Sequence, residues 1–271
     1  MGRFRRLVRS GTTFLGALAL AVVALALPAS PAHALPSGAA WSGSWDYYTP
    51  DLYQFTGTLP GLEFYGWGSD VNGTRSAQGS VRDTADDGRC ARLVLFATGS
   101  GYVADVTACG QGRNEGFNTG PFTGNLIIMV RRILPATGAQ DKYFHLVIPD
   151  SASDPGMRAT ATGTKWSYYT DTAFQYRVIR PGVKIEGFGW HQTGDLRSVT
   201  GAVYNTGSSQ SCATGGASGS SGTPASATTC GTGTSASFTT WYLGGWVTAE
   251  ACYGSSGAAR QCLSAYVPTP M

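Results

Sequence analysis

The chain has 271 residues, of which 38 are glycine and only 13% are charged, and its formal net charge is +3. Four arginines lie among the first nine residues, and without residues 1–34 the chain has 15 basic and 16 acidic residues, a net charge of −1. A nearly neutral chain with no basic cluster lacks the electrostatic footprint that nucleic acids and anionic membrane surfaces require. The composition therefore excludes both as expected partners.

Residues 1–34 have the pattern of a secretory signal peptide. The arginines precede an apolar run from Phe14 to Leu27, and the small-residue site Ala32-His33-Ala34 follows it. The run of 14 residues is too short to cross a bilayer as a helix, and no run of 18 or more apolar residues comes later. We expect cleavage after Ala34, a secreted extracellular product and no membrane span after signal cleavage.

Short runs of alternating apolar residues dominate the rest of the chain. Examples are residues 93–96, 126–130 and 143–148, separated by turn signals such as Asp87-Gly88 and Thr137-Gly138. This alternation predicts β-strands, and helical periodicity is absent after residue 34. We therefore predict an all-β fold.

The sequence also repeats itself. At an offset of 121 residues, one aromatic cluster falls on another: Trp45, Tyr47 and Tyr48 on Trp166, Tyr168 and Tyr169. Pro60-Gly61 falls on Pro181-Gly182 at the same offset, and Cys90 falls on Cys212 at 122. We infer a duplication with residues 35–149 as the first module, 150–165 as a linker and 166–271 as the second module. The predicted fold is two tandem homologous β-sandwich or barrel-like modules.

Six cysteines in an exported chain predict three disulfides. Equivalent cysteines of a repeat should have equivalent partners, which favours Cys90 with Cys109 and Cys212 with Cys230. Cys252 then pairs with Cys262, and the alignment places Ile133 and Tyr143 at these positions in the first module. The two modules are therefore expected to be stapled by disulfides.

The segment between Cys212 and Cys230 is rich in glycine and serine and has almost no apolar side chain to bury. We expect an edge strand or an open loop there, held mainly by its disulfide, with fast amide exchange from Ala213 to Thr229.

Catalytic and metal-binding patterns are weak. There is no Gly-x-Ser-x-Gly elbow and no Cys-x-x-Cys, and after residue 34 only His145 and His191 could serve as a catalytic base. His191, beside the turn Thr193-Gly194-Asp195, is the better candidate of the two. The acids from Asp83 to Asp87 fit a hairpin turn better than a calcium loop. We predict no metal site and no cofactor.

Aromatic residues fall into two groups. Those that both modules share, such as Trp45 and Trp166, are assigned mainly to folding. Those unique to the second module are better candidates for a ligand site, because an exposed aromatic patch on a monomeric protein is uncommon without a role. The tentative ligand-binding residues are Trp190, His191, Trp241, Tyr242 and Trp246.

One motif carries a family resemblance. Residues 79–84 (GSVRDT) followed by residues 87–92 (DGRCAR), with Cys109 beyond them, resemble a motif of small secreted β-domain proteins of actinobacteria, and residues 251–262 are similar to the end of these domains. The second module lacks the acids of the first motif. The resemblance implies export and a β fold, and it implies no particular activity.

Together these observations favour a secreted, non-catalytic binding or structural protein whose ligand is a cell-wall glycan or another exported protein. One alternative is an inhibitor of extracellular hydrolases, with the loop between Cys252 and Cys262 preorganised for insertion into an active site. An alternative of another class is a hydrolase that uses His191. We expect any specific function in residues 166–268, where the extra aromatics lie.

Overall fold

The computed structural model describes residues 41–150, 162–168, 170, 172–191, 196–255 and 260–267, so the predicted signal peptide lies outside the described residues. Within these ranges the chain is all-β, as predicted, and contains no helix. We call residues 41–150 the first half and residues 162–267 the second half.

Each half contributes nine strands. The first half contains β1 (Ser42–Thr49), β2 (Leu52–Leu59), β3 (Leu62–Val71), β4 (Thr74–Asp83), β5 (Cys90–Ala97), β6 (Gly101–Cys109), β7 (Asn114–Asn118), β8 (Leu126–Ile133) and β9 (Gln140–Ile148). The second half contains β10 (Gly163–Tyr168), β11 (Ala173–Arg180), β12 (Val183–His191), β13 (Leu196–Asn205), β14 (Ser211–Ser218), β15 (Ala225–Cys230), β16 (Ser235–Gly244), β17 (Val247–Ser255) and β18 (Gln261–Val267).

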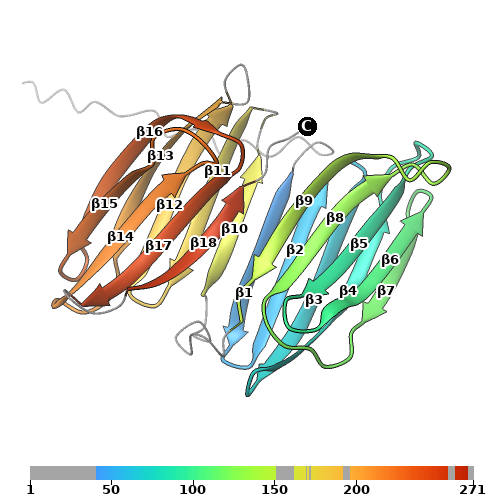
Figure 1. The fold of residues 1–271 in the computed structure, drawn as a ribbon, viewed down its shortest axis with the longest axis horizontal. Helices are drawn as coiled ribbons and strands as arrows, with labels where there is room; N and C mark the ends of the chain where they lie inside the picture. The colour runs from blue at the N-terminus through green and yellow to red at the C-terminus, as the bar shows by residue number, and fades with distance from the viewer. Residues whose placement is uncertain are drawn as a thin grey trace, which may run out of the picture. The chain divides into compact units, whose positions relative to one another are not determined.

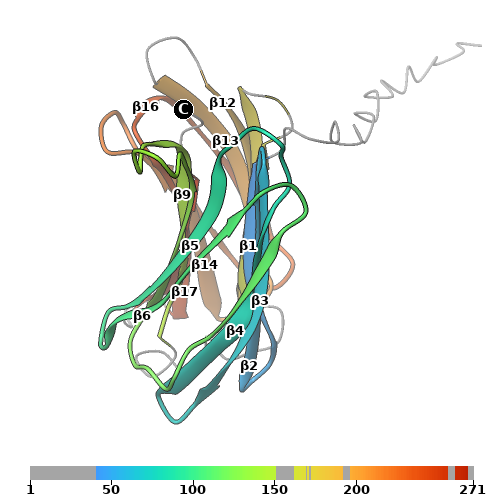
Figure 2. The ribbon, with the colours of Figure 1, turned by 90° about the vertical axis from the view of Figure 1, so that its right-hand side faces the viewer.

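The strands form three antiparallel sheets. A ten-stranded sheet has the order β16-β13-β12-β11-β10-β1-β2-β3-β4-β7, and two four-stranded sheets have the orders β6-β5-β8-β9 and β15-β14-β17-β18. Both halves therefore have the same strand order in both of their layers (Figure 1). Figure 2 shows the four-stranded sheets on the same side of the ten-stranded sheet, so that no described strand covers its other face, which we call the uncovered face.

The halves join through their first strands. β1 pairs antiparallel with β10, with Ser44 opposite Lys165 and Trp45 opposite Thr164. This pairing merges two five-stranded sheets into one, an arrangement that no local sequence pattern predicts. It also places Gly163 and Lys165 in a strand, although the sequence assigns them to the linker of residues 150–165; residues 151–161 lie outside the described residues.

The core is continuous across this junction. The buried Trp166 ring of the second half meets the ring of Phe144 edge-on, with their centroids 5.0 Å apart. A Cβ added to Gly43 would lie 2.9 Å from the same indole, so a side chain at position 43 would displace it. The two halves therefore share one hydrophobic core along the β1–β10 seam.

The three disulfides join the pairs expected from the sequence: Cys90 with Cys109, Cys212 with Cys230 and Cys252 with Cys262. Each pair lies directly opposite across two neighbouring antiparallel strands. The strand register corrects one detail of the alignment. Cys252 occupies the position of Arg131, not of Ile133, because the length difference between the halves falls in the turn after β8 and β17.

The expectation of an open loop between Cys212 and Cys230 is wrong for its first part. β14 is an inner strand between β15 and β17, and only β15 lies at the sheet edge. Small inward residues allow this, because Ala213 and Ala217 are buried and a Cβ at Gly215 would lie 2.3 Å from Ile185. The sequence lacks large apolar side chains here because the two layers approach closely.

Candidate functional site

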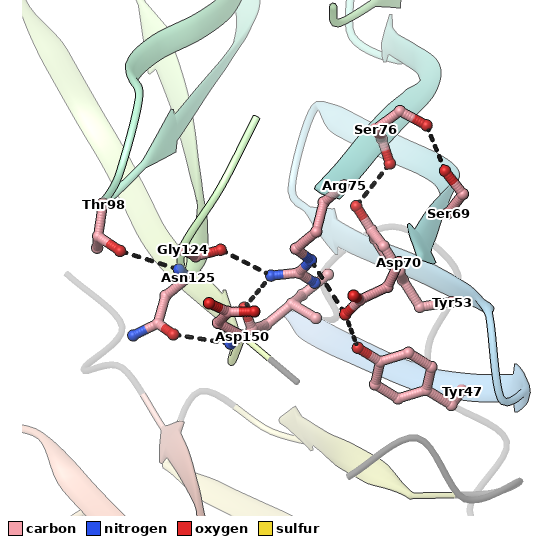
Figure 3. A network of polar contacts seen from close by, with 11 residues as sticks. Tyr47, Tyr53, Ser69, Asp70, Arg75, Ser76, Thr98, Gly124, Asn125 and Asp150 are labelled. Carbon is pink, nitrogen blue, oxygen red and sulfur yellow. Dashed lines mark hydrogen bonds and ion pairs between the residues drawn. The ribbon is translucent and has the colours of Figure 1, made fainter. Parts of the chain in front are cut away.

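A buried polar network lies at one end of the first half (Figure 3). The Tyr47 hydroxyl donates to Asp70 at 2.5 Å, and the Asp70 carboxylate lies 3.4 Å from Nε of Arg75. The Arg75 guanidinium also donates to the carbonyls of Gly124 and Ile148, at 3.0 and 3.1 Å. Asp70 and Arg75 are completely buried, so the pair compensates two charges that could not be buried singly.

The second half repeats this network with one change. Tyr168 and Arg197 take the places of Tyr47 and Arg75, and Arg197 donates to the carbonyl of Val267 at 3.0 Å. His191 stands at the position of Asp70, with its Nε2 2.9 Å from the Tyr168 hydroxyl. Burial raises the pKa of the Tyr168 phenol, and Arg197 partly opposes this shift. The equivalence favours a structural role for His191, which the sequence offered as a catalytic candidate.

The uncovered face of the ten-stranded sheet carries a different kind of feature. On β3, Tyr65 and Trp67 point outward while Gly66 and Gly68 point inward. The glycines are required, because a Cβ at position 66 would lie 2.3 Å from the Phe55 ring, and a Cβ at position 68 would collide with Tyr53. On its inward face β3 therefore has glycines that make room for large core rings, and on its outward face it has two exposed aromatics.

These aromatics border an open groove of about 530 Å³ over β1, β2 and β3. The rings of Tyr65 and Trp67 are nearly parallel, with an angle of 14° between their planes and centroids 6.3 Å apart. They are 53% and 42% exposed, so both offer apolar surface to a ligand. The groove is lined by Ser44, Asp46, Tyr48, Gln54, Phe55, Thr56, Tyr65, Gly66 and Trp67.

Polar side chains accompany the aromatics in the groove. Gln54 donates from Nε2 to both carboxylate oxygens of Asp46, at 3.0 and 3.3 Å, which holds the two side chains side by side across β1 and β2. The Thr56 hydroxyl donates to the carbonyl of Phe64 at 3.0 Å. The site therefore combines flat apolar surface with an oriented carboxylate, an amide and hydroxyl groups, the mixture found in ligand sites.

The corresponding surface of the second half keeps one exposed aromatic, Phe188 at the position of Trp67, but is otherwise charged. Glu186 stands at the position of Tyr65 and pairs with Arg177 at 3.0 Å and with Lys184 at 3.1 Å. Ser167 replaces Asp46 and accepts a hydrogen bond from Gln175 at 3.0 Å. Shared strand order has therefore not preserved the groove, which is a feature of the first half.

The predicted ligand-binding aromatics of the second half are all exposed, but Trp246 lies apart from the other three, and no ring stacking joins these four described residues. Trp190 on β12 meets Phe188 edge-on at 4.9 Å, whereas Trp246 packs edge-on against His145 of the first half at 5.7 Å. Trp241 and Tyr242 form a bulge on β16. Within the described ranges, no ring contact joins any of these four residues to another.

The side chains of the other candidate sites are engaged in local hydrogen bonds, an ion pair and a disulfide. The Asp83 carboxylate accepts the amides of Ala85 and Gly110, and Asp87 pairs with Arg132, so the acidic stretch 83–87 holds a turn together. Of the described residues, Glu250, Cys252 and Cys262 form a group with metal-ligand spacing, but its two sulfurs are bonded to each other. The tip of the Cys252–Cys262 hairpin, residues 256–259, lies outside the described residues.

Sequence reasoning missed the groove for an identifiable reason. It treated aromatics of the first half as folding residues and searched for ligand residues only where the two modules differ. The usable signal was the alternation in residues 64–68, FYGWG, where aromatic and glycine positions take opposite faces of one strand. A strand that buries glycine and exposes Tyr65 and Trp67 departs from the usual pattern.

The described ranges include no apolar helix of the length that a membrane crossing requires. No protein-family model matches this sequence, and a search of curated proteins finds no significant match to it.

Proposed function

We propose that this chain is a secreted, non-catalytic protein that binds a glycan in the groove over β1, β2 and β3. The observation that carries the proposal is the nearly parallel, exposed pair Tyr65 and Trp67 beside the hydrogen-bonded pair Asp46 and Gln54. Each component has a matching part in a sugar. The C–H groups of a pyranose form an apolar face that packs on aromatic rings, and its equatorial hydroxyls bind carboxylate and amide groups.

The acidic content of the groove supports binding over hydrolysis. Glycosidases use two carboxyl groups that flank the scissile bond, about 5 to 9.5 Å apart. Asp46 is the one acid among the residues that line the groove, and Gln54 already occupies both of its oxygens. A single engaged carboxylate suits recognition of hydroxyl groups.

Two features support secretion. Residues 1–34 have the composition of a signal peptide, and all six cysteines form disulfides, which is consistent with an extracellular or otherwise oxidising environment. A polysaccharide outside the cell is then an accessible ligand. The shared strand order of the two halves is also what a duplication of one module would produce.

A binding experiment with matched aromatic variants tests this function. The protein is incubated with cellulose, chitin and purified peptidoglycan, and the bound fraction is measured for the parent chain, for Trp67→Ala and for Tyr102→Ala. Tyr102 is 76% exposed and lies on β6, outside the groove, so its loss controls for a general loss of aromatic surface.

We expect at least one polysaccharide to retain the parent chain, and Trp67→Ala to weaken this retention about tenfold or more, because a stacked aromatic in a ligand site is worth over 1 kcal/mol. Tyr102→Ala should bind as the parent does. Failure of the parent chain to bind any of these materials, or equal binding by Trp67→Ala, would contradict the proposal.

A further inference from the structure

We infer that the outer face of the second half carries a second glycan subsite, formed by Phe188, Trp190, Trp241 and Tyr242, and that the ligand is a long, extended polysaccharide that reaches both subsites. This inference rests on the proposed function of the groove and names its substrate class: an extended polymer, not a short oligosaccharide or a chain end.

The two aromatic sets lie on one continuous surface. Residues opposite each other in antiparallel strands point to the same face, and Ser44 on β1 lies opposite Lys165 on β10. The outward side of β3 is therefore also the outward side of β12. Five strand spacings separate β3 from β12 in the sheet, which corresponds to about 24 Å. A ligand in contact with both sets must be longer than this.

The strand register brings the second set together around one residue. Ser198 on β13 pairs with Trp190 on β12, and on its other side it faces the bulge of Trp241 and Tyr242 on β16. Ser198 belongs to the outward-facing series of β13, yet it is only 4% exposed. The aromatic residues on its two sides thus border a common patch, to which Phe188 adds a ring in contact with Trp190.

The backbone at the bulge is held in an uncommon conformation. Tyr242 has a φ of 63°, in the left-handed region that residues other than glycine seldom adopt, and such strain is concentrated at functional sites. The turn after β14 braces it, since Gly244 exchanges backbone hydrogen bonds with Ser220 and Ser221, at 2.9 and 3.0 Å. The Thr240 hydroxyl also donates to the carbonyl of Thr223.

The bulge acquires its aromatic character only in the second half. Gly120 and Pro121 occupy the positions of Trp241 and Tyr242 in the first half. The next residue pairs with the equivalent arginine in both halves: Phe122 with Arg75, and Leu243 with Arg197. The first half therefore also places two residues opposite one on the neighbouring strand, but without exposed rings and without a left-handed residue at either position. Packing of the sheet does not require Trp241 and Tyr242, which are each 59% exposed.

The surface between the two subsites favours a hydrophilic chain as the occupant. Lys165 is exposed near the β1–β10 seam, and Arg177 and Glu186 form an ion pair beyond it. The centre of a protein interface is depleted of charged residues, so this strip would cost a protein partner desolvation energy. A polysaccharide can stack on the aromatics at both ends and present hydroxyl groups to the charged strip between them.

The test compares a polymer with a short oligosaccharide that can occupy only one subsite. The probes are the polysaccharide retained in the experiment above and its trisaccharide, and the variants are Trp67→Ala, Trp190→Ala/Trp241→Ala and the combination of all three. Tyr102→Ala is the surface control. Thermal unfolding of each variant identifies any loss of folding.

The double variant Trp190→Ala/Trp241→Ala should weaken binding to the polymer about 100-fold, the lower end of the avidity range for two linked sites, and leave trisaccharide affinity unchanged. Trp67→Ala should weaken binding to both probes. Trp241→Phe alone should retain most of the polymer affinity, since it keeps a flat ring.

The possible failures are distinguishable. If Trp190→Ala/Trp241→Ala binds the polymer as the parent does while Trp67→Ala does not, the second subsite is wrong and the groove stands. If Trp67→Ala changes neither affinity, the proposed function itself fails. If the parent binds polymer and trisaccharide equally tightly, the requirement for a long chain is wrong.

Discussion

The two halves of the chain have the same strand order but fill it differently. The first half packs its layers with large side chains, such as the buried Leu93 on β5, whereas the second half has Gly215 at that position on β14. The first half balances a buried arginine with Asp70, whereas the second places His191 there. The comparison teaches that strand order tolerates exchange of both core volume and buried charge, provided that each neighbourhood adjusts.

The largest expected effect sharpens the charge comparison. Asp70→Asn leaves the fully buried Arg75 without its anion, which should lower the free energy of unfolding by about 3 to 5 kcal/mol. His191→Asn keeps a polar side chain opposite the Tyr168 hydroxyl and should cost about 1 kcal/mol. Denaturant unfolding followed by tryptophan fluorescence measures both, and a smaller loss for Asp70→Asn than for His191→Asn would contradict the charge argument.

The second prediction tests the core comparison. Leu93→Ala should create a cavity and cost about 2 to 5 kcal/mol. Gly215→Ala should also destabilise, by about 1 to 3 kcal/mol, because its new Cβ would lie 2.3 Å from Ile185. Thermal unfolding compares the two variants. A stabilising Gly215→Ala would show that the layers of the second half are more loosely packed than the structure indicates.

A third prediction concerns the equivalent disulfides. Each closes a loop of similar length, with separations of 19 and 18 residues, and removal of either should cost about 3 kcal/mol. The local consequences should differ, because β6 packs Val103 and Val106 against the core, whereas β15 contributes only alanines and threonine.

Hydrogen exchange measures this difference. Cys212→Ala/Cys230→Ala should accelerate exchange throughout β15, while Cys90→Ala/Cys109→Ala should affect β6 less. In the parent chain, inner strand β14 should exchange more slowly than edge strand β15. Equal protection of β6 and β15 in the two variants would remove the proposed dependence on apolar contacts.

The smallest effect concerns the contact between the halves at His145 and Trp246. Burial, with a smaller contribution from Arg131, lowers the pKa of His145 below its usual 6.5. As the pH falls, the unfolded state therefore binds a proton at His145 before the folded state does. The contribution of His145 to the free energy of unfolding is highest above about pH 6.5 and falls as the pH drops below that value. Unfolding at pH 7.5 and 5 should show a smaller pH dependence in His145→Gln. An unchanged pH dependence would assign it to other groups.

Local patterns in the sequence were sufficient for the all-β class, because short apolar runs between turn residues, such as residues 126–130, are typical of strands. The cysteine pairs followed from the internal correspondence of Cys90 with Cys212. The close approach of β14 to β12 was not predictable in this way. A segment of glycine and alanine is typical of an open loop, and only the structure shows that Ile185 and Val203 pack over it.

The groove was predictable only in part. Alternation in β3 assigns Tyr65 and Trp67 to one face, but it does not say which face the second layer covers. The positions of Asp46 and Gln54 beside them depend on the pairing of β1 with β2, and the continuity of the whole outer surface depends on the pairing of β1 with β10. Contacts between distant segments decide these features, and a single sequence contains little record of them.

The position of Trp166 has a consequence for how the chain is made. Its indole lies against Phe144 and above Gly43, so the interior of the first half is completed by a residue that is synthesised after that half has ended. Until β10 arrives, β1 also presents an unpaired strand edge, which favours association with other chains. A nascent chain that stops near residue 150 should therefore be a poor folding unit, although its strands are all present.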